Sequence, residues 1–306
     1  MPRHTRLVAL AAVVAAVLPL SACGGNPTTA GSSGGSSTIV IGSANFPENE
    51  LLAEMYAQAL EAKGVKVQRK FNIGARERYL AALKDGSINM IPEYNGALLA
   101  ALSKGGVVPS GVTTTDQVNA ALTKVLPKGT EILTSSPAED KDTLTVEPQT
   151  AKKYHLKAIG DLKPVAGRLT LGGGPEFAKR YQGVVGLKKV YGLTFKDFKP
   201  LDPGGPLTKA ALKKGDIDVA NIFSTDSTIE TDHLVVLDDT KDLFLAQNIT
   251  PVIESSKVNG KVTSAVNDLS QALTTDDLTK YLAEVQVDKK DTATVAKEFL
   301  DAHQMG

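Results

Sequence analysis

Residues that could carry out catalysis are few and scattered along this chain of 306 residues. The four histidines lie far apart, at His4, His155, His233 and His303. None has the spacing of a metal-ligand pair such as His-x-x-x-His, and no Gly-x-Ser-x-Gly motif supplies a nucleophilic serine. Paired acids such as Asp216 and Asp218 fall in expected turns or first helical turns, where carboxylates commonly act as caps. The sequence therefore predicts that the protein is not an enzyme and holds neither a metal nor a cofactor.

Composition limits the partners that the protein could have. Lysine plus arginine and aspartate plus glutamate are both 34, and no basic cluster offers the positive field that nucleic-acid binding requires. Hydrophobic residues make up 42% of the chain, enough for one large core or two smaller ones. We therefore expect a globular protein without a nucleic-acid partner. Because tryptophan is absent, any site built on aromatic faces must draw on the 7 tyrosines and 8 phenylalanines.

Residues 1–22 have the pattern of a lipoprotein signal peptide. Arg3 and Arg6 precede an apolar run of 14 residues, shorter than the roughly 20 residues of a membrane span. The run ends in Leu-Ser-Ala-Cys, which resembles the bacterial lipobox, in which the cysteine, here Cys23, is lipidated. A buried free thiol is the alternative role of this only cysteine. Residues 23–37 are rich in glycine and serine and are expected to be a flexible tether, so the mature protein would sit on the extracytoplasmic face of the cell membrane.

Two stretches of the chain repeat each other and define the expected architecture. Residues 80–94 (LAALKDGSINMIPEY) match residues 209–223 (KAALKKGDIDVANIF), and the strand pattern at 39–42 parallels that at 169–172. Each copy reads as strand, helix, strand, loop, helix and strand. This alternation indicates parallel strands joined by right-handed crossovers, hence an α/β fold. The repeat predicts two lobes whose strand ends line one cleft.

The chain is expected to cross between the lobes twice. The β-rich stretches 142–146 and 248–253 flank the second copy and are candidate hinge crossings. The expected division gives the first lobe residues 38–142 together with 253–306, and the second lobe residues 143–252. After residue 253 the pattern predicts three helices that would pack on the first lobe, at 261–273, 275–285 and 292–302, the second beginning with Thr275 as its N-cap.

Five motifs of the mature chain stand out together: 42–49 (GSANFPEN), 91–96 (IPEYNG), 183–192 (GVVGLKKVYG), 223–226 (FSTD) and the tail 278–300. They resemble the glycine betaine, carnitine, choline and proline binding proteins of ABC importers, over about residues 38–303. The resemblance implies a type II periplasmic-binding-protein fold, with a ligand cleft between two lobes joined by two hinge crossings. It also implies a monomeric, lipid-anchored receptor that captures a compatible solute and delivers it to a membrane permease and its ATPase.

The resemblance implies a cage of aromatic side chains around a quaternary ammonium such as choline, carnitine or betaine. Such a cation cannot donate a hydrogen bond and is best held by aromatic faces. Tyr94 matches the family's cage tyrosine at the end of the motif strand, and its repeat mate Phe223 falls at the equivalent place in the second lobe. Phe46 and Phe177, which follow strand-terminal glycines, are further candidates. For each ring, packing in the core at a strand end is the alternative.

Several positions depart from the family pattern. Where relatives carry a cage tyrosine at the first crossing, this chain has Asp142, and Ala44 and Ala97 stand where relatives bind a ligand carboxylate. Another cage tyrosine of the family is also missing here. Its position falls on Leu207, Thr208 or Lys209, depending on how the extra residue in the preceding loop 203–206 is aligned. Arg180 could bind a carboxylate, although a solvated helix-face arginine is the alternative. The anionic Asp142 favours a ligand with a cation and no carboxylate, or one rich in hydroxyl groups.

The other candidate ligand-binding residues belong to the same motifs: Ser43, Asn45, Asn95 and Thr225. A second function stays open beside import. The same fold could serve as a surface receptor for a neutral polyhydroxylated or aromatic small molecule.

Overall fold

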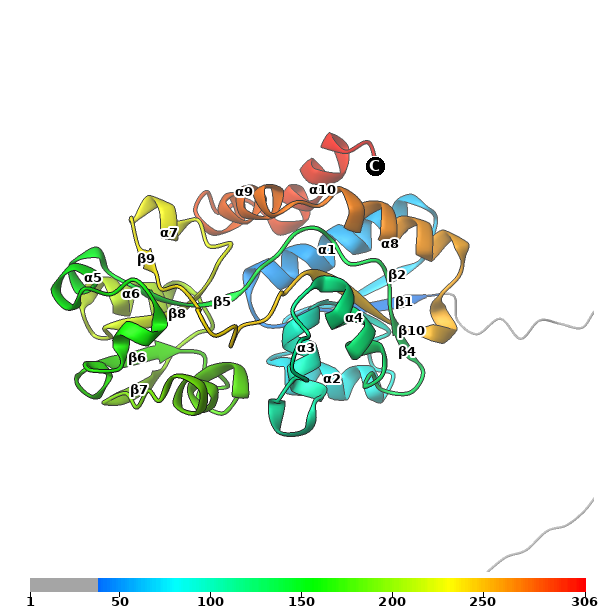
Figure 1. Cartoon of the computed structure of the whole chain (residues 1–306). Coiled ribbons are helices and arrows are strands. Elements are labelled where there is room, and N and C mark those ends of the chain that lie inside the picture. The colour runs from blue at the N-terminus through cyan, green and yellow to red at the C-terminus, as the bar shows by residue number, and fades with distance from the viewer. Residues whose placement is uncertain (1–37) are drawn as a thin grey trace, which may run out of the picture. The chain divides into compact units, whose positions relative to one another are not determined.

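The computed structural model describes residues 38–306, so the predicted signal peptide and the whole predicted tether, including Cys23, lie outside the described residues. The described chain forms two five-stranded sheets, each with its own helices (Figure 1). We call the part around the first sheet the first lobe and the part around the second sheet the second lobe. Within these residues, no helix is both long and apolar enough to span a bilayer.

The first sheet has the strand order β2-β1-β3-β10-β4. Its strands are β1 (Ile39–Gly42), β2 (Val67–Lys70), β3 (Met90–Tyr94), β4 (Thr130–Ile132) and β10 (Ile249–Glu254). Strand β1 is parallel to β2 and β3, whereas β10 is antiparallel to β3 and β4. The helices that follow these strands are α1 (Pro47–Ala62), α2 (Arg76–Lys84), α3 (Asn95–Leu102) and α4 (Thr115–Thr123). The parallel strands and their crossover helices are those that the sequence pattern predicted.

The second sheet repeats this topology in the order β7-β6-β8-β5-β9. Its strands are β5 (Asp142–Val146), β6 (Thr170–Gly173), β7 (Asp197–Pro200), β8 (Val219–Phe223) and β9 (Val235–Val236). Strand β5 takes the place of β10 and is antiparallel to β8. The helices of this lobe are α5 (Pro148–Tyr154), α6 (Pro206–Lys214), α7 (Thr228–Thr231) and the π-helical segments η4 (Tyr181–Val185) and η5 (Leu187–Tyr191). Short 3-10 segments complete the two lobes: η1 (Lys104–Gly106), η2 (Ile159–Leu162), η3 (Ala166–Arg168) and η6 (Ser255–Lys257).

Equivalent glycines show how closely the two copies correspond. A Cβ atom on Gly42, at the end of β1, would lie 2.7 Å from Cδ1 of Ile88, and one on Gly172 in β6 would lie 2.6 Å from Cδ1 of Ile217. Each strand-end glycine therefore makes room for the same isoleucine of the repeat. The copies differ after this point, because α1 is continuous whereas the corresponding helix of the second lobe is broken by non-helical backbone at Gln182 and Gly183.

The chain crosses between the lobes just before each predicted hinge stretch. Residues 142–146 form β5 of the second sheet, and β10 begins at Ile249 in the first sheet, so each strand starts its lobe earlier in the chain than the expected boundaries at 142/143 and 252/253. The two crossing segments lie side by side (Figure 1), where the Asp140 amide donates to the Gln247 carbonyl over 3.1 Å. The β-rich stretches predicted as crossings are the strands that follow the crossings. The crossing segments themselves are too short to show a periodic pattern in the sequence.

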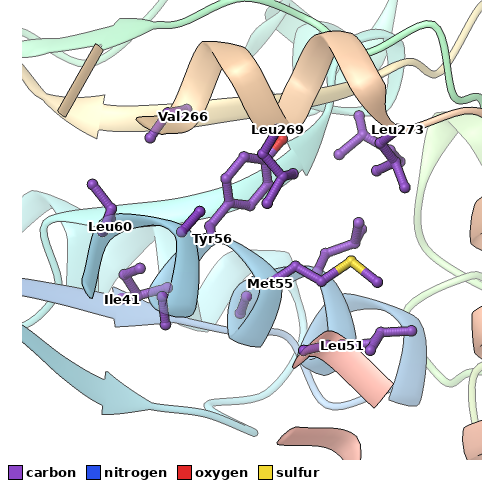
Figure 2. Close-up of a cluster of buried hydrophobic side chains, with 14 of the residues drawn as sticks. Ile41, Leu51, Met55, Tyr56, Leu60, Val266, Leu269 and Leu273 are labelled. Carbon is purple, nitrogen blue, oxygen red and sulfur yellow. The ribbon is translucent and has the colours of Figure 1, made fainter. Parts of the chain in front are cut away.

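The C-terminal helices return to the first lobe, as the sequence predicted. They are α8 (Gly260–Ala272), α9 (Thr275–Gln286) and α10 (Thr292–Ala302), and they share one buried core with α1. Figure 2 shows Tyr56 of α1 directed toward Leu269 of α8, and the Tyr56 hydroxyl lies 2.8 Å from the Ser270 hydroxyl. The N-cap prediction was wrong by one residue: Thr274, not Thr275, accepts from the Asp277 amide and closes a capping box.

Candidate functional site

A cavity of about 50 Å³ lies between the two lobes. Its walls come from residues that follow the carboxyl ends of β1, β6 and β7, from the ends of β3 and β8, and from both crossing segments. Ligands of open α/β sheets bind beyond the carboxyl ends of the strands, and here both sheets contribute theirs. One water molecule needs roughly 10 to 15 Å³, so the cavity has room for a small polar group. We call it the aromatic cavity.

Three rings from both lobes form one wall of this cavity. The centroid of the Phe46 ring lies 5.2 Å from that of Phe223 and 6.1 Å from that of Tyr94. The Phe223 ring is backed by Gly204, whose φ of +61° and close approach leave no room for a side chain, since a Cβ would lie 2.8 Å from the ring. Phe177 also lines the cavity, is buried, and stacks on Phe244 with a centroid distance of 6.3 Å.

Tyr94 is both a core residue and a lining residue. Its side chain is only 5% exposed and packs in the core of the first lobe, yet it also borders the cavity. Its hydroxyl donates to Oε1 of Glu48 over 2.6 Å. The two roles that the sequence treated as alternatives therefore coincide in this residue.

Acidic side chains face the rings. Asp140, Asp142 and Glu176 all line the cavity. Oδ1 of Asp142 accepts from Nδ2 of Asn221 over 2.9 Å. Burial raises the pKa of Asp142 above its ordinary value, and the Asn221 hydrogen bond together with the charges of Arg180 and Arg76 offsets only part of that rise.

Two arginines line the cavity, and each already has a carboxylate partner. Arg76, which sequence reasoning missed, donates to Glu93 from Nε at 2.8 Å and from Nη2 at 3.0 Å, and the Tyr79 hydroxyl donates to the same carboxylate over 2.6 Å. Arg180 reaches across from the second lobe to Glu77 over 3.2 and 3.1 Å. The signal for the first pair was available, because an acid inside the apolar strand of the Pro-Glu-Tyr motif needs a buried cation.

Behind the rings, a buried hydroxyl joins the lobes. Thr225, predicted as a lining residue, instead donates to Glu48 of α1 and lies 3.1 Å from Oδ1 of Asp140 in the first crossing. Burial raises the pKa of both carboxyl groups, and the hydrogen bonds to Thr225 offset only part of that rise. These hydrogen bonds connect the aromatic wall to the first crossing segment, because Glu48 also accepts from Tyr94.

Two other predicted residues hold the backbone rather than line the cavity. Oγ of Ser43 accepts from the Asn72 amide over 2.8 Å and donates to the Ala44 carbonyl. Asn95 accepts from the Asn248 amide over 2.9 Å and so ties the start of α3 to the second crossing. By contrast, Asn45 lines the cavity at its exposed edge.

The loop between β7 and α6 contributes a residue that the sequence did not single out. Leu207 is 63% exposed, and Lys209 pairs with Asp226 over 2.7 Å, so neither replaces a cage ring. Pro203 lines the cavity instead, and Gln247 does so from the second crossing. Gln247 is 3% exposed, and its Nε2 has no hydrogen-bond partner within residues 38–306.

The described residues contain no group of three or more His, Cys, Asp and Glu side chains placed to hold a metal ion. The cavity is lined by rings, carboxyl groups, amides and two paired arginines.

Comparison with known proteins places this geometry in context. The family described as the substrate binding domain of ABC-type glycine betaine transport systems matches residues 37–302. The carnitine transport binding protein OpuCC of Listeria monocytogenes is 29% identical over 87% of this chain and 88% of its own length. The glycine-betaine-binding protein of Pseudomonas aeruginosa is 24% identical over 88% of each chain.

Solved structures agree with the fold. The crystal structure of a glycine betaine/carnitine/choline ABC transporter has a TM-score of 0.68 and 26% identity, covering 87% of this chain and 99% of that one. Lactococcal OpuAC, in a closed conformation complexed with glycine betaine, has a TM-score of 0.60 at 17% identity, covering 87% and 96%. These likenesses confirm the expected two-lobed, type II periplasmic-binding-protein fold. With the family match over nearly all described residues, they show that the chain belongs to the substrate-binding domains of ABC-type glycine betaine transport systems.

Proposed function

We propose that this protein is the extracytoplasmic receptor of an ABC importer and captures a quaternary ammonium solute such as choline, carnitine or betaine. It then delivers the solute to a membrane permease driven by an ATPase. The observation that carries the proposal is the aromatic cavity, where rings of both lobes and carboxyl groups without an ion pair among the described residues border one space between the lobes.

The charge balance of the cavity favours a cation. The lining arginines are held by their own carboxylates, Arg76 by Glu93 and Arg180 by Glu77. The lining acids Asp142 and Glu176 have no ion pair among the described residues. A cation beside these carboxylates and over the ring faces gains from both interactions without needing to donate a hydrogen bond.

Capture would work by closure of the lobes. The Phe46 and Phe223 rings, and the Arg180 and Glu77 side chains, come from opposite lobes and meet only when the lobes are together. A ligand that contacts both sides binds the closed form better than the open form and shifts the equilibrium toward it.

The membrane anchor is part of the proposal. Cys23 ends the lipobox-like sequence and would carry the lipid, and the tether would let a monomeric receptor move against its permease. Expression of the full chain with Cys23→Ala should release the protein from the membrane fraction, whereas wild type should stay in it. Release of both would contradict the anchor.

Isothermal titration tests the ligand class directly. Choline is compared with 3,3-dimethylbutan-1-ol, its neutral isostere, in which carbon replaces nitrogen. Loss of the charge should weaken binding by about 1 to 2 kcal/mol, roughly 5- to 30-fold. Equal binding of both compounds, or binding of neutral polyols or aromatic compounds only, would favour the alternative receptor. A folded protein that binds none of these solutes would refute the proposal.

A further inference from the structure

A hydroxyl group of the second lobe lies between two carboxyl groups behind the aromatic cavity. Oγ1 of Thr225 contacts Oε2 of Glu48, in α1 of the first lobe, and lies 3.1 Å from Oδ1 of Asp140, in the first crossing segment. Thr225 is 0% exposed, and Glu48 and Asp140 are each 2% exposed. We call these three side chains the carboxyl cluster. Because they are buried, their polar atoms must be satisfied by one another and by the groups around them.

The carboxyl cluster has too few protons if both acids are ionised. A threonine hydroxyl has one proton to donate, and an ionised carboxylate can only accept. The Thr225 proton can serve the contact with Glu48 or the contact with Asp140, and the other contact would then bring two acceptors together. One additional proton resolves this conflict, because a protonated Glu48 can donate to Thr225 while Thr225 donates to Asp140.

The other contacts of the cluster fit a proton on Glu48 and a negative charge on Asp140. Oε1 of Glu48 accepts from the Tyr94 hydroxyl over 2.6 Å, as the carbonyl oxygen of a protonated acid can. Oδ1 of Asp140 accepts from the Thr225 amide and from the Ser224 hydroxyl, each over 3.2 Å, and donors of this kind favour the charged form. Asp140 lines the aromatic cavity, so its charge can still face a cation there.

The charges around the cluster also favour an added proton. Asp226 raises the pKa of Glu48, and Asp142 raises the pKa of Asp140, although burial is the largest cause of both rises. The cations of the first crossing and of the cavity wall, and Lys209 of α6, are engaged by other acids. The pairs are Lys141 with Glu139, Arg76 with Glu93, Arg180 with Glu77, and Lys209 with Asp226.

Opening of the lobes would take the carboxyl cluster apart. Thr225 would stay beside Asp140, because the Ser224 amide donates to the Lys141 carbonyl over 2.9 Å and joins the two segments. Glu48 belongs to the other lobe and would be separated from both. Once exposed to water, the two carboxyl groups ionise with their ordinary pKa values, so the shared proton is released.

We infer that closure of the lobes takes up one proton, shared by Glu48 and Asp140, so that ligand affinity rises as pH falls. This inference rests on the proposed function, in which the ligand binds the closed form. Above the ordinary pKa values of 4.5 and 3.8, the open form has released the proton that the closed form keeps. Affinity is therefore lost as pH rises through the raised pKa of the closed pair, and below about pH 4 the dependence on this pair disappears.

Titration calorimetry with choline counts the protons directly. At about pH 7, the binding enthalpy is compared in phosphate and in Tris, two buffers that differ in their enthalpy of ionisation. Wild type should take up about one-half to one proton for each choline bound. Its affinity should accordingly fall roughly three- to tenfold for each pH unit between about 6 and 8.

Glu48→Gln imitates the protonated acid, because its amide nitrogen can donate to Thr225 while its oxygen accepts from Tyr94. This variant should take up no proton and bind choline with nearly the same affinity, within about threefold, at every pH from about 5 to 8. Glu50→Gln is the matched control, because Glu50 lies in the same turn of α1 but is only partly buried and accepts from Asn72 over 2.7 Å. It should keep the proton uptake and the pH dependence of wild type.

The outcomes separate the inference from the proposed function. Choline binding without proton uptake, or with equal uptake in wild type and Glu48→Gln, overturns the inference and leaves the proposed function standing. If the folded protein binds no quaternary ammonium solute, the proposed function falls, and small-angle scattering without ligand decides the inference. Wild type should then be more compact at about pH 5 than at about pH 8, and Glu48→Gln equally compact at both. A wild-type profile that does not change between these pH values overturns the inference.

Discussion

The ring of Phe46, which follows β1 in the first lobe, packs against the ring of Phe223, which ends β8 in the second lobe, with centroids 5.2 Å apart. The two residues belong to different motifs and do not occupy equivalent positions of the repeat. The two-lobed fold nevertheless brings them together at one wall. Because each ring belongs to a different lobe, the contact between them requires the lobes to be closed, and both rings also line the cavity proposed for the ligand.

Phe223→Leu should weaken binding of a quaternary ammonium by about 1 to 2 kcal/mol, roughly 5- to 30-fold, because it removes one aromatic face. The ring is only partly buried, so the midpoint of thermal unfolding should change little. Calorimetric titration and thermal unfolding of the same preparation measure both effects. An unchanged affinity would remove Phe223 from the site.

Tyr94 should behave differently, because it belongs to the core and to the cavity together. Tyr94→Ala should cost about 3 to 5 kcal/mol of unfolding free energy through the hole that it leaves, and it should also weaken the ligand. Tyr94→Phe keeps the ring and loses only the hydrogen bond to Glu48, so ligand affinity should stay within about threefold. Urea unfolding and calorimetric titration of both variants measure stability and affinity. A large affinity loss in Tyr94→Phe would contradict the prediction that the ring, and not the hydroxyl, contributes to binding.

The sequence was sufficient for the fold and for several of the residues that line the aromatic cavity. The internal repeat predicted where strands end, and strand ends are where Tyr94 and Phe223 lie. It could not predict the partners of those residues, because Glu48 and Thr225 are 177 positions apart and meet only through the closed arrangement of the lobes. The position of Gln182 could not be predicted either, because the expected helix of the second copy is broken at that residue and periodicity in a sequence does not reveal such a break.

Stability should fall as pH rises from near 4, because of the carboxyl groups of Glu48 and Asp140. Burial holds their folded-state pKa values above the ordinary 4.5 and 3.8, so the native state keeps protons that the unfolded chain has released. This contribution is fully present below the unfolded pKa and is lost as pH rises through the raised folded pKa. Among the neighbours of the pair, the charge of Asp226 adds to the rise of the Glu48 pKa, whereas the hydrogen bonds from Thr225 and Tyr94 offset part of that rise.

Glu48→Gln isolates this effect from the other acids of the protein. It removes one of the two interacting carboxyl groups, so the melting temperature should depend less on pH between about 4 and 8 than in wild type. Thermal unfolding at several pH values in that range gives the slope of melting temperature against pH for wild type and for the variant. Parallel curves for wild type and variant would show that the pair does not titrate as described.

Asp142→Asn tests the charge that replaces a cage ring. The amide oxygen can still accept from Asn221, so the local geometry should persist while the negative charge is lost. A cationic ligand should bind about 1 to 2 kcal/mol more weakly, whereas a neutral hydroxyl-rich compound should be nearly indifferent. Choline and a neutral polyol, titrated against both proteins, provide the measurement. An equal effect on both ligands would assign Asp142 a structural role only.

Gly106→Ala should oppose closure, because Gly106 of the first lobe lies against Tyr181 of the second. A Cβ atom on Gly106 would stand 2.4 Å from Cβ of Tyr181, a distance that the two lobes can relieve only by moving apart. Gly105→Ala is the matched control: its φ of +68° imposes the same backbone strain as the +76° of Gly106, but a Cβ there would meet nothing within 4 Å. Both variants should therefore lose a similar, small amount of stability, of about 1 kcal/mol. Only Gly106→Ala should also weaken ligand binding, roughly tenfold or more, and leave the protein more expanded than wild type in small-angle scattering at the same ligand concentration. Equal affinities for the two variants would mean that the lobes close without this contact.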